Sequence, residues 1–157
     1  MSLDQSSTSS GIAIAELNSK NDDWKLIHHS TYKPRGNNFD EKMLNLCDYL
    51  NELIQQYDIE LLLIEDIYNL RSISTTTKLA NLQGAIKELS NINNIEFLVI
   101  HPSSWHQLLP TKSRKRNDLK NASKQFVGTK FGLTDLNDDE CDAICILTYY
   151  LMKEEQL

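Results

Sequence analysis

The segment ELLLIED, residues 60–66, decides the fold that this sequence predicts. Its short, almost unbroken apolar run is typical of a strand that is buried on both faces of a sheet. Residues 95–101, IEFLVIH, have the same character and predict another buried strand. Each run follows a segment with an apolar stripe at helical spacing, over 39–57 and 73–91. Because parallel strands are joined by crossover connections, usually helices, we expect these two strands to pair in parallel.

The N-terminal part of the chain adds antiparallel strands to this parallel pair. Residues 10–17, SGIAIAEL, and residues 24–32 have strand character and are separated by a short polar turn, which favours a hairpin. Residues 1–5 predict a short strand ahead of them. These three strands form a meander.

The C-terminal part is predicted to be helical. His101-Pro102 breaks the chain, and residues 103–109 predict a short helix with a serine cap. A basic loop over 110–117 leads to two helices, near 117–131 and 139–153. We therefore predict one domain, residues 1–157, of the α/β class: a mixed sheet of an antiparallel meander plus parallel strands, flanked by helices on both faces.

Composition excludes several classes of protein. Forty per cent of the 157 residues are hydrophobic, which is enough for a packed core and argues against a disordered chain. No apolar run reaches the roughly 18 residues that a membrane span needs. The N-terminus lacks the basic start and apolar stretch of a signal peptide. We expect an intracellular protein with no membrane segment.

The cysteines and histidines give no metal-binding pattern. Three cysteines argue against a disulfide framework, and neither CxxC nor HExxH occurs. Cys141 and Cys145 are one helical turn apart, so a soft-metal site is conceivable there. Buried, inert thiols are the favoured interpretation.

Four acidic residues stand where predicted elements end or begin: Asp4, Glu65, Asp139 and Asp142. The first two end strands, and the other two open the last helix. Because residues three apart on a helix share a face, Asp139 and Asp142 can both point at the strand ends, while Glu140 points elsewhere. Asp138, four residues before Asp142, remains an alternative to Asp139.

Clustered carboxylates suit the two-metal hydrolysis of phosphodiesters, since hard ions such as Mg²⁺ take oxygen ligands. Such carboxylates raise one another's pKa until metal binds, so folding alone does not explain a cluster. Each acid also has an ordinary explanation. Asp4 suits a turn, Glu65 a charged sheet rim, and the other two a helix N-terminus. These explanations cover the acids one at a time and not the whole pattern.

One segment of the chain is strongly basic, although the net charge is −6. Residues 111–130 contain one acid, Asp118, and seven basic residues: Lys112, Arg114, Lys115, Arg116, Lys120, Lys124 and Lys130. Such a segment can bind phosphate locally. A solvated helix face explains the charges equally well, so the other motifs must decide.

Four motifs occur in order from residue 4 to about residue 147. They are DQSSTSSGIA at 4–13, IEDIY at 64–68, KLANLQG at 78–84 and DECDAI at 139–144. Together they resemble the RuvC family of Holliday junction resolvases: a strand-end Asp with Gly seven residues on, a strand-end Glu with an aromatic three residues on, K-L-x-x-x-x-G, and D-x-x-D-A. One motif alone is weak, whereas four in order are specific.

The resemblance implies a ribonuclease H-like fold, a homodimer, and Mg²⁺-dependent nicking of two opposed strands at a branched DNA junction, with two ions per site and Mn²⁺ as a substitute. It places Asp4, Glu65, Asp139 and Asp142 as catalytic metal ligands, and Tyr68 as an aromatic that stacks on a junction base. The DNA-binding residues that it implies are Lys78, Arg114, Lys115, Arg116 and Lys120. Arg116 aligns best with a cation near the scissile phosphate, with Lys115 and Lys120 as alternatives.

The sequence also departs from the family. Gln5-Ser6 stands where bacterial members usually have Pro-Gly, which is typical of divergent relatives such as phage-encoded ones. We expect the protein in the cytoplasm of a bacterium or of a phage-infected host cell.

Two other functions fit the same motifs. A ribonuclease acting on RNA–DNA hybrids would use the same fold and metals, and would recognise the 2′-hydroxyl. A non-catalytic architectural protein would bind junctions without cutting them. Four intact carboxylates argue against the latter, because acids beside phosphate hinder binding unless a metal intervenes.

Overall fold

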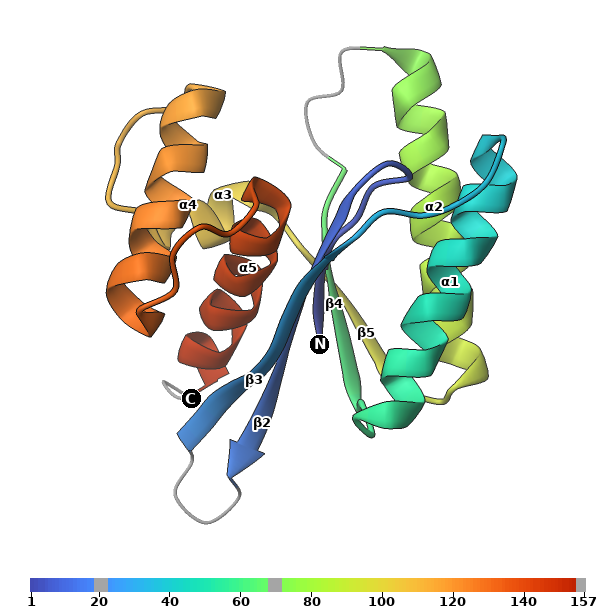
Figure 1. Cartoon of the computed structure of the whole chain (residues 1–157), viewed down its shortest axis with the longest axis horizontal. Helices are drawn as coiled ribbons and strands as arrows, with labels where there is room; N and C mark the ends of the chain where they lie inside the picture. The colour runs from blue at the N-terminus through green and yellow to red at the C-terminus, as the bar shows by residue number, and fades with distance from the viewer. Residues whose placement is uncertain (19–22, 68–71, 155–157) are drawn as a thin grey trace.

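The computed structural model describes residues 1–18, 23–67 and 72–154, and shows one mixed sheet between two helical layers (Figure 1). The strands are β1 (Ser2–Asp4), β2 (Ser10–Asn18), β3 (Asp23–Tyr32), β4 (Leu61–Glu65) and β5 (Glu96–Ile100). The helices are α1 (Phe39–Gln56), α2 (Ile73–Ile92), α3 (Pro102–Trp105), the 3₁₀ turn η1 (His106–Leu108), α4 (Arg116–Phe131) and α5 (Asp138–Glu154). None of these helices is long and apolar enough to cross a membrane.

The strand order is β3-β2-β1-β4-β5, so the short β1 lies at the centre of the sheet. The meander β1-β2-β3 is antiparallel, whereas β1 pairs with β4, and β4 with β5, in parallel. The predicted combination of a meander with parallel strands is confirmed. The pairing of β1 with β4 continues to Met1, whose backbone carbonyl accepts a hydrogen bond from the backbone N–H of Leu63 at 2.8 Å.

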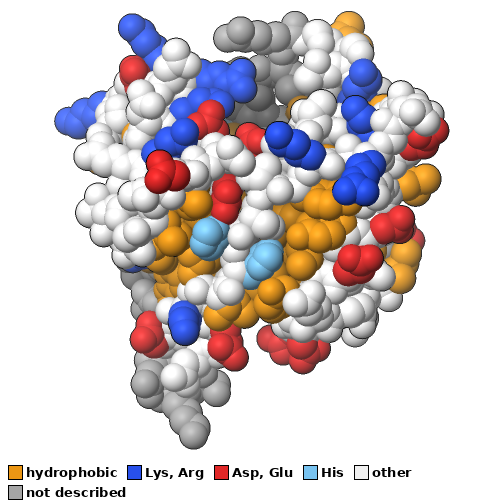
Figure 2. Space-filling model, viewed as in Figure 1, with side chains coloured by type: hydrophobic (Ala, Val, Ile, Leu, Met, Phe, Trp, Pro, Cys, Tyr) orange, Lys and Arg blue, Asp and Glu red, His pale blue; other side chains and the backbone are white. Residues whose placement is uncertain are grey.

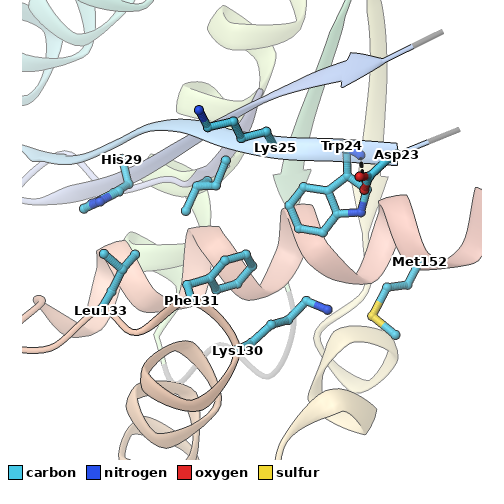
Figure 3. A pocket seen from close by; sticks show the side chains of 9 residues that line it. Asp23, Trp24, Lys25, His29, Lys130, Phe131, Leu133 and Met152 are labelled. Carbon is cyan, nitrogen blue, oxygen red and sulfur yellow. Dashed lines mark hydrogen bonds between the residues drawn. The ribbon is translucent and has the colours of Figure 1, made fainter. Parts of the chain in front are cut away.

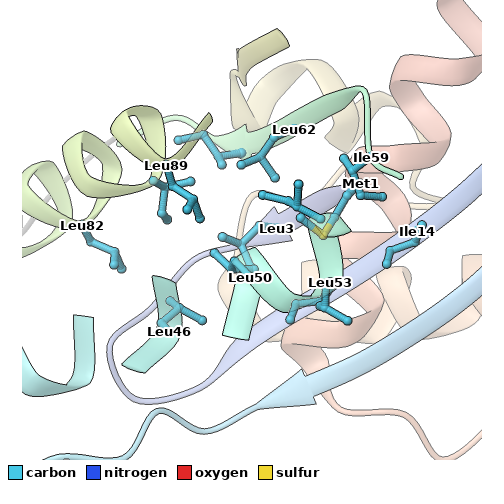
Figure 4. Packing of buried hydrophobic residues seen from close by; sticks show 14 residues of the cluster. Met1, Leu3, Ile14, Leu46, Leu50, Leu53, Ile59, Leu62, Leu82 and Leu89 are labelled. Atoms are coloured by element: carbon cyan, nitrogen blue, oxygen red, sulfur yellow. The ribbon is translucent and has the colours of Figure 1, made fainter. Parts of the chain in front are cut away.

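Side chains alternate across the sheet, which divides the core into two halves. Leu3, Ile14 and Leu62 face α1 and α2, where they pack with Leu50 and Leu82 (Figure 4). The other half lies under α4 and α5, and includes Ala13, Leu63, Trp105, Val127 and Ile144. The prediction of helices on both faces is confirmed (Figure 1).

Two local predictions are wrong. The apolar run over 95–101 predicts a strand buried on both faces, but within residues 1–18, 23–67 and 72–154 β5 is an edge strand with β4 as its one neighbour, and Val99 is 39% exposed. The helix after it has no serine cap. It begins at Pro102, a residue suited to a first helical position, and the backbone N–H of Ser103 donates to Nδ1 of His101 at 3.2 Å.

A glycine allows α5 to approach the sheet. A Cβ atom on Gly11 would lie 1.8 Å from the carbonyl oxygen of Asp139 and 2.7 Å from the backbone nitrogen of Glu140. Gly11 is the register partner of Asp4, so this contact sets the first turn of α5 directly over the end of β1. One turn further on, the Ser2 hydroxyl donates to the carbonyl of Ala143 at 2.7 Å.

We predict that Gly11→Ala forces the first turn of α5 away from β2. Both clashing groups are backbone atoms, so overpacking should lower the free energy of unfolding by about 1–3 kcal/mol, as measured by urea denaturation. Gly84→Ala is the matched control, because its Cβ would meet nothing within 4 Å and should stabilise α2 by roughly 0.5–1 kcal/mol. Equal stability of Gly11→Ala and the unmodified chain would contradict the close approach.

Candidate active site

Acidic side chains gather at one edge of the sheet, where the central parallel strands end. Asp4 is the last residue of β1 and Glu65 the last of β4. These strands are paired as far as Leu3 with Ile64, so the two acids end neighbouring strands. Asp4 follows Ser2, and Glu65 follows Leu63, by two residues, so both lie on the face that α5 covers. The first turns of α5 bring Asp139 and Asp142 to the same place.

The four carboxylates are electrostatically coupled. Burial raises the pKa of Asp4 well above its usual value, and the charges of Glu65, Asp142 and Asp139 raise it further. Burial also raises the pKa of Glu65 to about 7, with a contribution from Asp142, and that of Asp142 to about 6, with a contribution from Asp139. The Lys120 ammonium opposes the shifts in the pKa of Asp4 and of Asp142. The cluster is therefore short of positive charge.

Three of these carboxylates have well-defined surroundings. The indole N–H of Trp105 donates to Oε1 of Glu65 at 2.9 Å, and the Ser9 hydroxyl donates to Oδ2 of Asp139 at 2.5 Å. Oδ1 of Asp142 is buried and makes no hydrogen bond of good geometry to the residues that the structure describes, although the Ser123 hydroxyl lies close enough to lower the pKa of Asp142. A buried carboxylate oxygen without a partner is costly unless another group, such as a cation, satisfies it.

Asp138 and Asp139, the two alternatives that the sequence leaves open, have different partners in the structure. Asp138 forms ion pairs with Lys120 and with Lys124, the latter at 2.9 Å. Hydrogen bonds from these two lysines hold the pKa of Asp138 below its usual value. The charge of Asp139 raises the pKa of both Asp4 and Asp142, whereas the charge of Asp138 raises the pKa of Asp142. Asp138 thus anchors two cations, and Asp139 lies with the acidic cluster.

Glu140 points away from the cluster, as predicted. It is 8% exposed, and its carboxylate accepts hydrogen bonds from Nδ1 of His29 and from the hydroxyl of Thr31, the latter at 3.3 Å. Asn137 donates to the same hydroxyl at 3.1 Å. These contacts tie the start of α5 to β3.

The donor set fits hard divalent cations. Carboxylate oxygens are the ligands that Mg²⁺ and Mn²⁺ take, and the raised pKa values of these buried, mutually repelling carboxylates point to missing positive charge. In the described part of the chain, however, no three His, Cys, Asp or Glu side chains converge closely enough to hold one ion as they stand. Trp105 and Ser9 engage two of the carboxylates instead. Cys141 and Cys145 are buried, and burial raises the pKa of Cys141 to about 11, in keeping with inert thiols.

The predicted DNA-binding residues have different positions. Arg114 and Lys115 are exposed in the loop before α4, and Arg116 is exposed at its first residue. Lys78 is exposed on α2, and Tyr68 lies outside the described residues. Lys120 is half-buried, and among the five basic residues of this set it is the one whose charge acts on the pKa of the acids. In Figure 2 the Lys and Arg side chains gather at the upper end, where α2 and α4 begin in Figure 1.

Sequence reasoning missed the residues that support the acids: Gln5, Ser9, Trp105, and the pair His29 and Glu140. Glu140 was expected to point elsewhere, but its partner was not identified. None of these contacts follows a spacing rule, because each joins elements that are distant in the sequence.

A pocket of about 500 Å³ lies apart from the acids, between β3 and the helices α4 and α5 (Figure 3). Its lining includes Trp24, Lys130 and Phe131, and Lys130 Nζ lies 5.9 Å from the ring centroid of each aromatic side chain. It contains none of the four acidic residues.

Comparison with known proteins decides the family. Residues 1–114 match the family model described as "Crossover junction endodeoxyribonuclease RuvC". The chain belongs to the RuvC family. A crossover junction endodeoxyribonuclease RuvC from Brachyspira hyodysenteriae is 25% identical over 133 residues, which are 84% of this chain and 81% of that protein.

Solved structures show the same fold. Thermus thermophilus RuvC in complex with a Holliday junction substrate superposes with a TM-score of 0.79 at 15% identity, over 98% of this chain and 93% of that one. The fowlpox virus Holliday junction resolvase gives a TM-score of 0.69 at 15% identity, over 99% and 96%. The predicted ribonuclease H-like fold is confirmed.

The raised pKa values predict that the acidic cluster costs the metal-free protein more stability as the pH rises. Glu65 and Asp142 are held protonated in the folded chain more than in the unfolded chain, so the folded chain binds more protons. Their contribution to the free energy of unfolding should be greatest below the ordinary pKa values of 4.5 and 3.8. The contribution of Glu65 should decrease as the pH rises from 4.5 to about 7, and that of Asp142 as the pH rises from 3.8 to about 6. Burial lowers the pKa of the Met1 amino group from 8.0 to about 5, which changes stability in the opposite direction over the same range. Urea unfolding in EDTA between roughly pH 4 and pH 8 therefore measures the contribution of an acid as the difference in slope between the unmodified chain and a variant that lacks it.

Asp142→Asn should flatten the slope and raise stability near neutral pH, because the carboxylate that costs energy when ionised is gone. Asp135→Asn removes the same charge from an exposed loop position, whose φ of 62° an Asn tolerates, and should leave the slope unchanged. A slope that is identical in the unmodified chain and in Asp142→Asn would show that Asp142 is not the strained group.

Proposed function

We propose that this chain resolves four-way (Holliday) or other branched DNA junctions by nicking two opposed strands, in a reaction that depends on two Mg²⁺ ions per active site, for which Mn²⁺ can substitute. The observation that carries the proposal is the set of four coupled carboxylates at one sheet edge of a RuvC-family chain. A cluster with this deficit of positive charge suits a site that binds cations and phosphate together.

Asp4, Glu65, Asp139 and Asp142 would hold the ions. When bound, two such ions activate the attacking water and stabilise the leaving 3′ oxygen. The chain's own part is to fix the ligands on rigid elements, two at strand ends and two on a helix. Gly11 brings that helix into place, since it allows the backbone of Asp139 to lie against β2.

Lys120 is the best-placed cation for the scissile phosphate. It lies close enough to Asp4 and Asp142 to lower their pKa values, and its ion pair with Asp138 restrains its side chain. Arg116 was the preferred residue on sequence grounds, but it is exposed at the start of α4. We assign Arg114, Lys115, Arg116 and Lys78 to the phosphate backbone away from the cut, and Tyr68 to stacking on a junction base.

We also propose that the protein acts as a homodimer. A four-way junction has two equivalent strands to cut, and a two-fold dimer presents an identical site to each. Exposed apolar side chains occur on both helices that could form the interface. Leu44 on α1 is 62% exposed, and Ile73 and Ile92 on α2 are 87% and 73% exposed.

Asp142→Asn should abolish metal-dependent nicking of a synthetic four-way junction while junction binding persists. The loss should exceed the roughly 10–100-fold cost of changing a residue that only supports a metal ligand. Nicking is measured on end-labelled junction strands, and binding by gel shift without divalent ions. The control Asp135→Asn should cut normally, and full activity of Asp142→Asn would remove it from the metal site.

Lys120→Ala and Arg116→Ala should have different effects. Arg116→Ala should weaken junction binding and reduce the slope of log affinity against log salt by about 1, because one phosphate contact is lost. Lys120→Ala should slow the cutting of bound junction, measured in single-turnover reactions, more than it weakens binding. The reverse pattern would return the role beside the scissile phosphate to Arg116.

A further inference from the structure

We propose that Trp105 and Gln5 are positioning residues that hold Glu65 in its metal-binding place, one through the carboxylate and the other through the backbone. This inference rests on the proposed metal-dependent function. The sequence marks Gln5 only as a departure from the usual Pro-Gly and does not single out Trp105, and the side-chain amide of Gln5 is occupied by the backbone of Glu65.

Trp105 fixes the carboxylate of Glu65. Its indole is 2% exposed and belongs to the core half under α4 and α5, with the His106 ring edge-on at 4.2 Å between centroids. Its Nε1 donates to Oε1 of Glu65 at 2.9 Å. An indole N–H is a single donor and cannot accept, so it can engage one carboxylate oxygen and leave the other for a cation. A rigid ring on one side of the carboxylate therefore limits its rotation.

Gln5 fixes the backbone of Glu65. Its side-chain amide donates from Nε2 to the Glu65 carbonyl at 2.6 Å, and its Oε1 accepts from the Glu65 backbone N–H at 3.2 Å. This two-point contact imitates a strand partner one residue beyond the end of β1. Gln5 is 8% exposed, so water has little access to its contacts. A replacement without an amide would therefore leave the backbone N–H and carbonyl of Glu65 unpaired at a buried position.

The two contacts act on the same residue from two directions. Gln5 follows Asp4 directly, so its amide also ties the end of β1 to the end of β4 and sets the two acids relative to each other. Residues that orient a metal ligand in this way are needed for affinity although they never touch the ion. Gln5 stands where bacterial members of the family usually have a proline, and its side-chain amide makes the two hydrogen bonds to Glu65 that a proline side chain cannot make.

The chain offers a matched control for Trp105. It has two tryptophans, and the other, Trp24, lines the separate pocket beside Phe131. Trp105→Phe keeps an aromatic ring in the core and removes the donor to Glu65. Trp24→Phe makes the same chemical change away from the acids.

Mn²⁺ binding to each DNA-free protein should be measured by electron paramagnetic resonance of the free ion, and unfolding in EDTA by thermal melting. We expect Trp105→Phe to bind Mn²⁺ about 10-fold more weakly than the unmodified chain, and Trp24→Phe to bind it equally well. In Trp24→Phe, Mn²⁺ should quench the remaining Trp105 fluorescence over the same concentration range that fills the site. In Trp105→Phe, the fluorescence of Trp24 should be unaffected.

Gln5→Met tests the second contact and serves if Trp105→Phe does not fold. It keeps the length of the side chain and removes both amide hydrogen bonds, and it should also weaken Mn²⁺ binding. Unchanged affinity in the folded variants, or an equal loss in Trp24→Phe, would overturn the inference while leaving the metal site standing. Failure of the unmodified chain to bind Mn²⁺ would instead overturn the proposed metal site, and this inference with it.

Discussion

One constraint dominates this structure: the carboxylates of Asp4, Glu65, Asp139 and Asp142 repel one another, yet they are held together at a partly buried edge of the sheet. Burial is the largest cause of the raised pKa values of Asp4, Glu65 and Asp142, and the charges of neighbouring acids raise these pKa values further. Such an arrangement lowers the stability of the metal-free chain, so the surrounding elements must be rigid enough to maintain it. The central pairing of β1 with β4 and the close contact of α5 with Gly11 supply that rigidity.

The first turn of α5 is fixed from several sides, and this explains how two more acids reach the strand ends. The Ser9 hydroxyl engages Asp139, while Glu140 is held on β3 by His29. Asp138 binds Lys120 and Lys124 on α4 and so holds two ammonium groups beside the site, although its own negative charge raises the pKa of Asp142. Three consecutive acids thus take three different roles because a helix turns each one toward a different element.

Patterns that repeat within one element predicted most of the architecture. Apolar runs and helical stripes gave the strands, the helices and the mixed sheet, and the spacing of Asp139 and Asp142 placed both on one helix face. The different surroundings of Asp138 and Asp139 depend on the lysines of α4, and the contacts of Gln5 and Trp105 with Glu65 join segments that are distant in the sequence. The exposure of β5 followed from its place at the sheet edge, which an apolar run alone does not reveal.

The central claim is that a RuvC-family chain with these four carboxylates cuts branched DNA. The most direct measurement incubates the unmodified protein with a synthetic four-way junction, a matched linear duplex and a matched RNA–DNA hybrid, each with and without Mg²⁺. Each strand is mapped for cleavage. The account predicts paired nicks in opposed strands of the junction, only with metal, and no comparable cutting of the duplex or hybrid. Cutting of the hybrid alone, or junction binding without cutting in any metal, would contradict it.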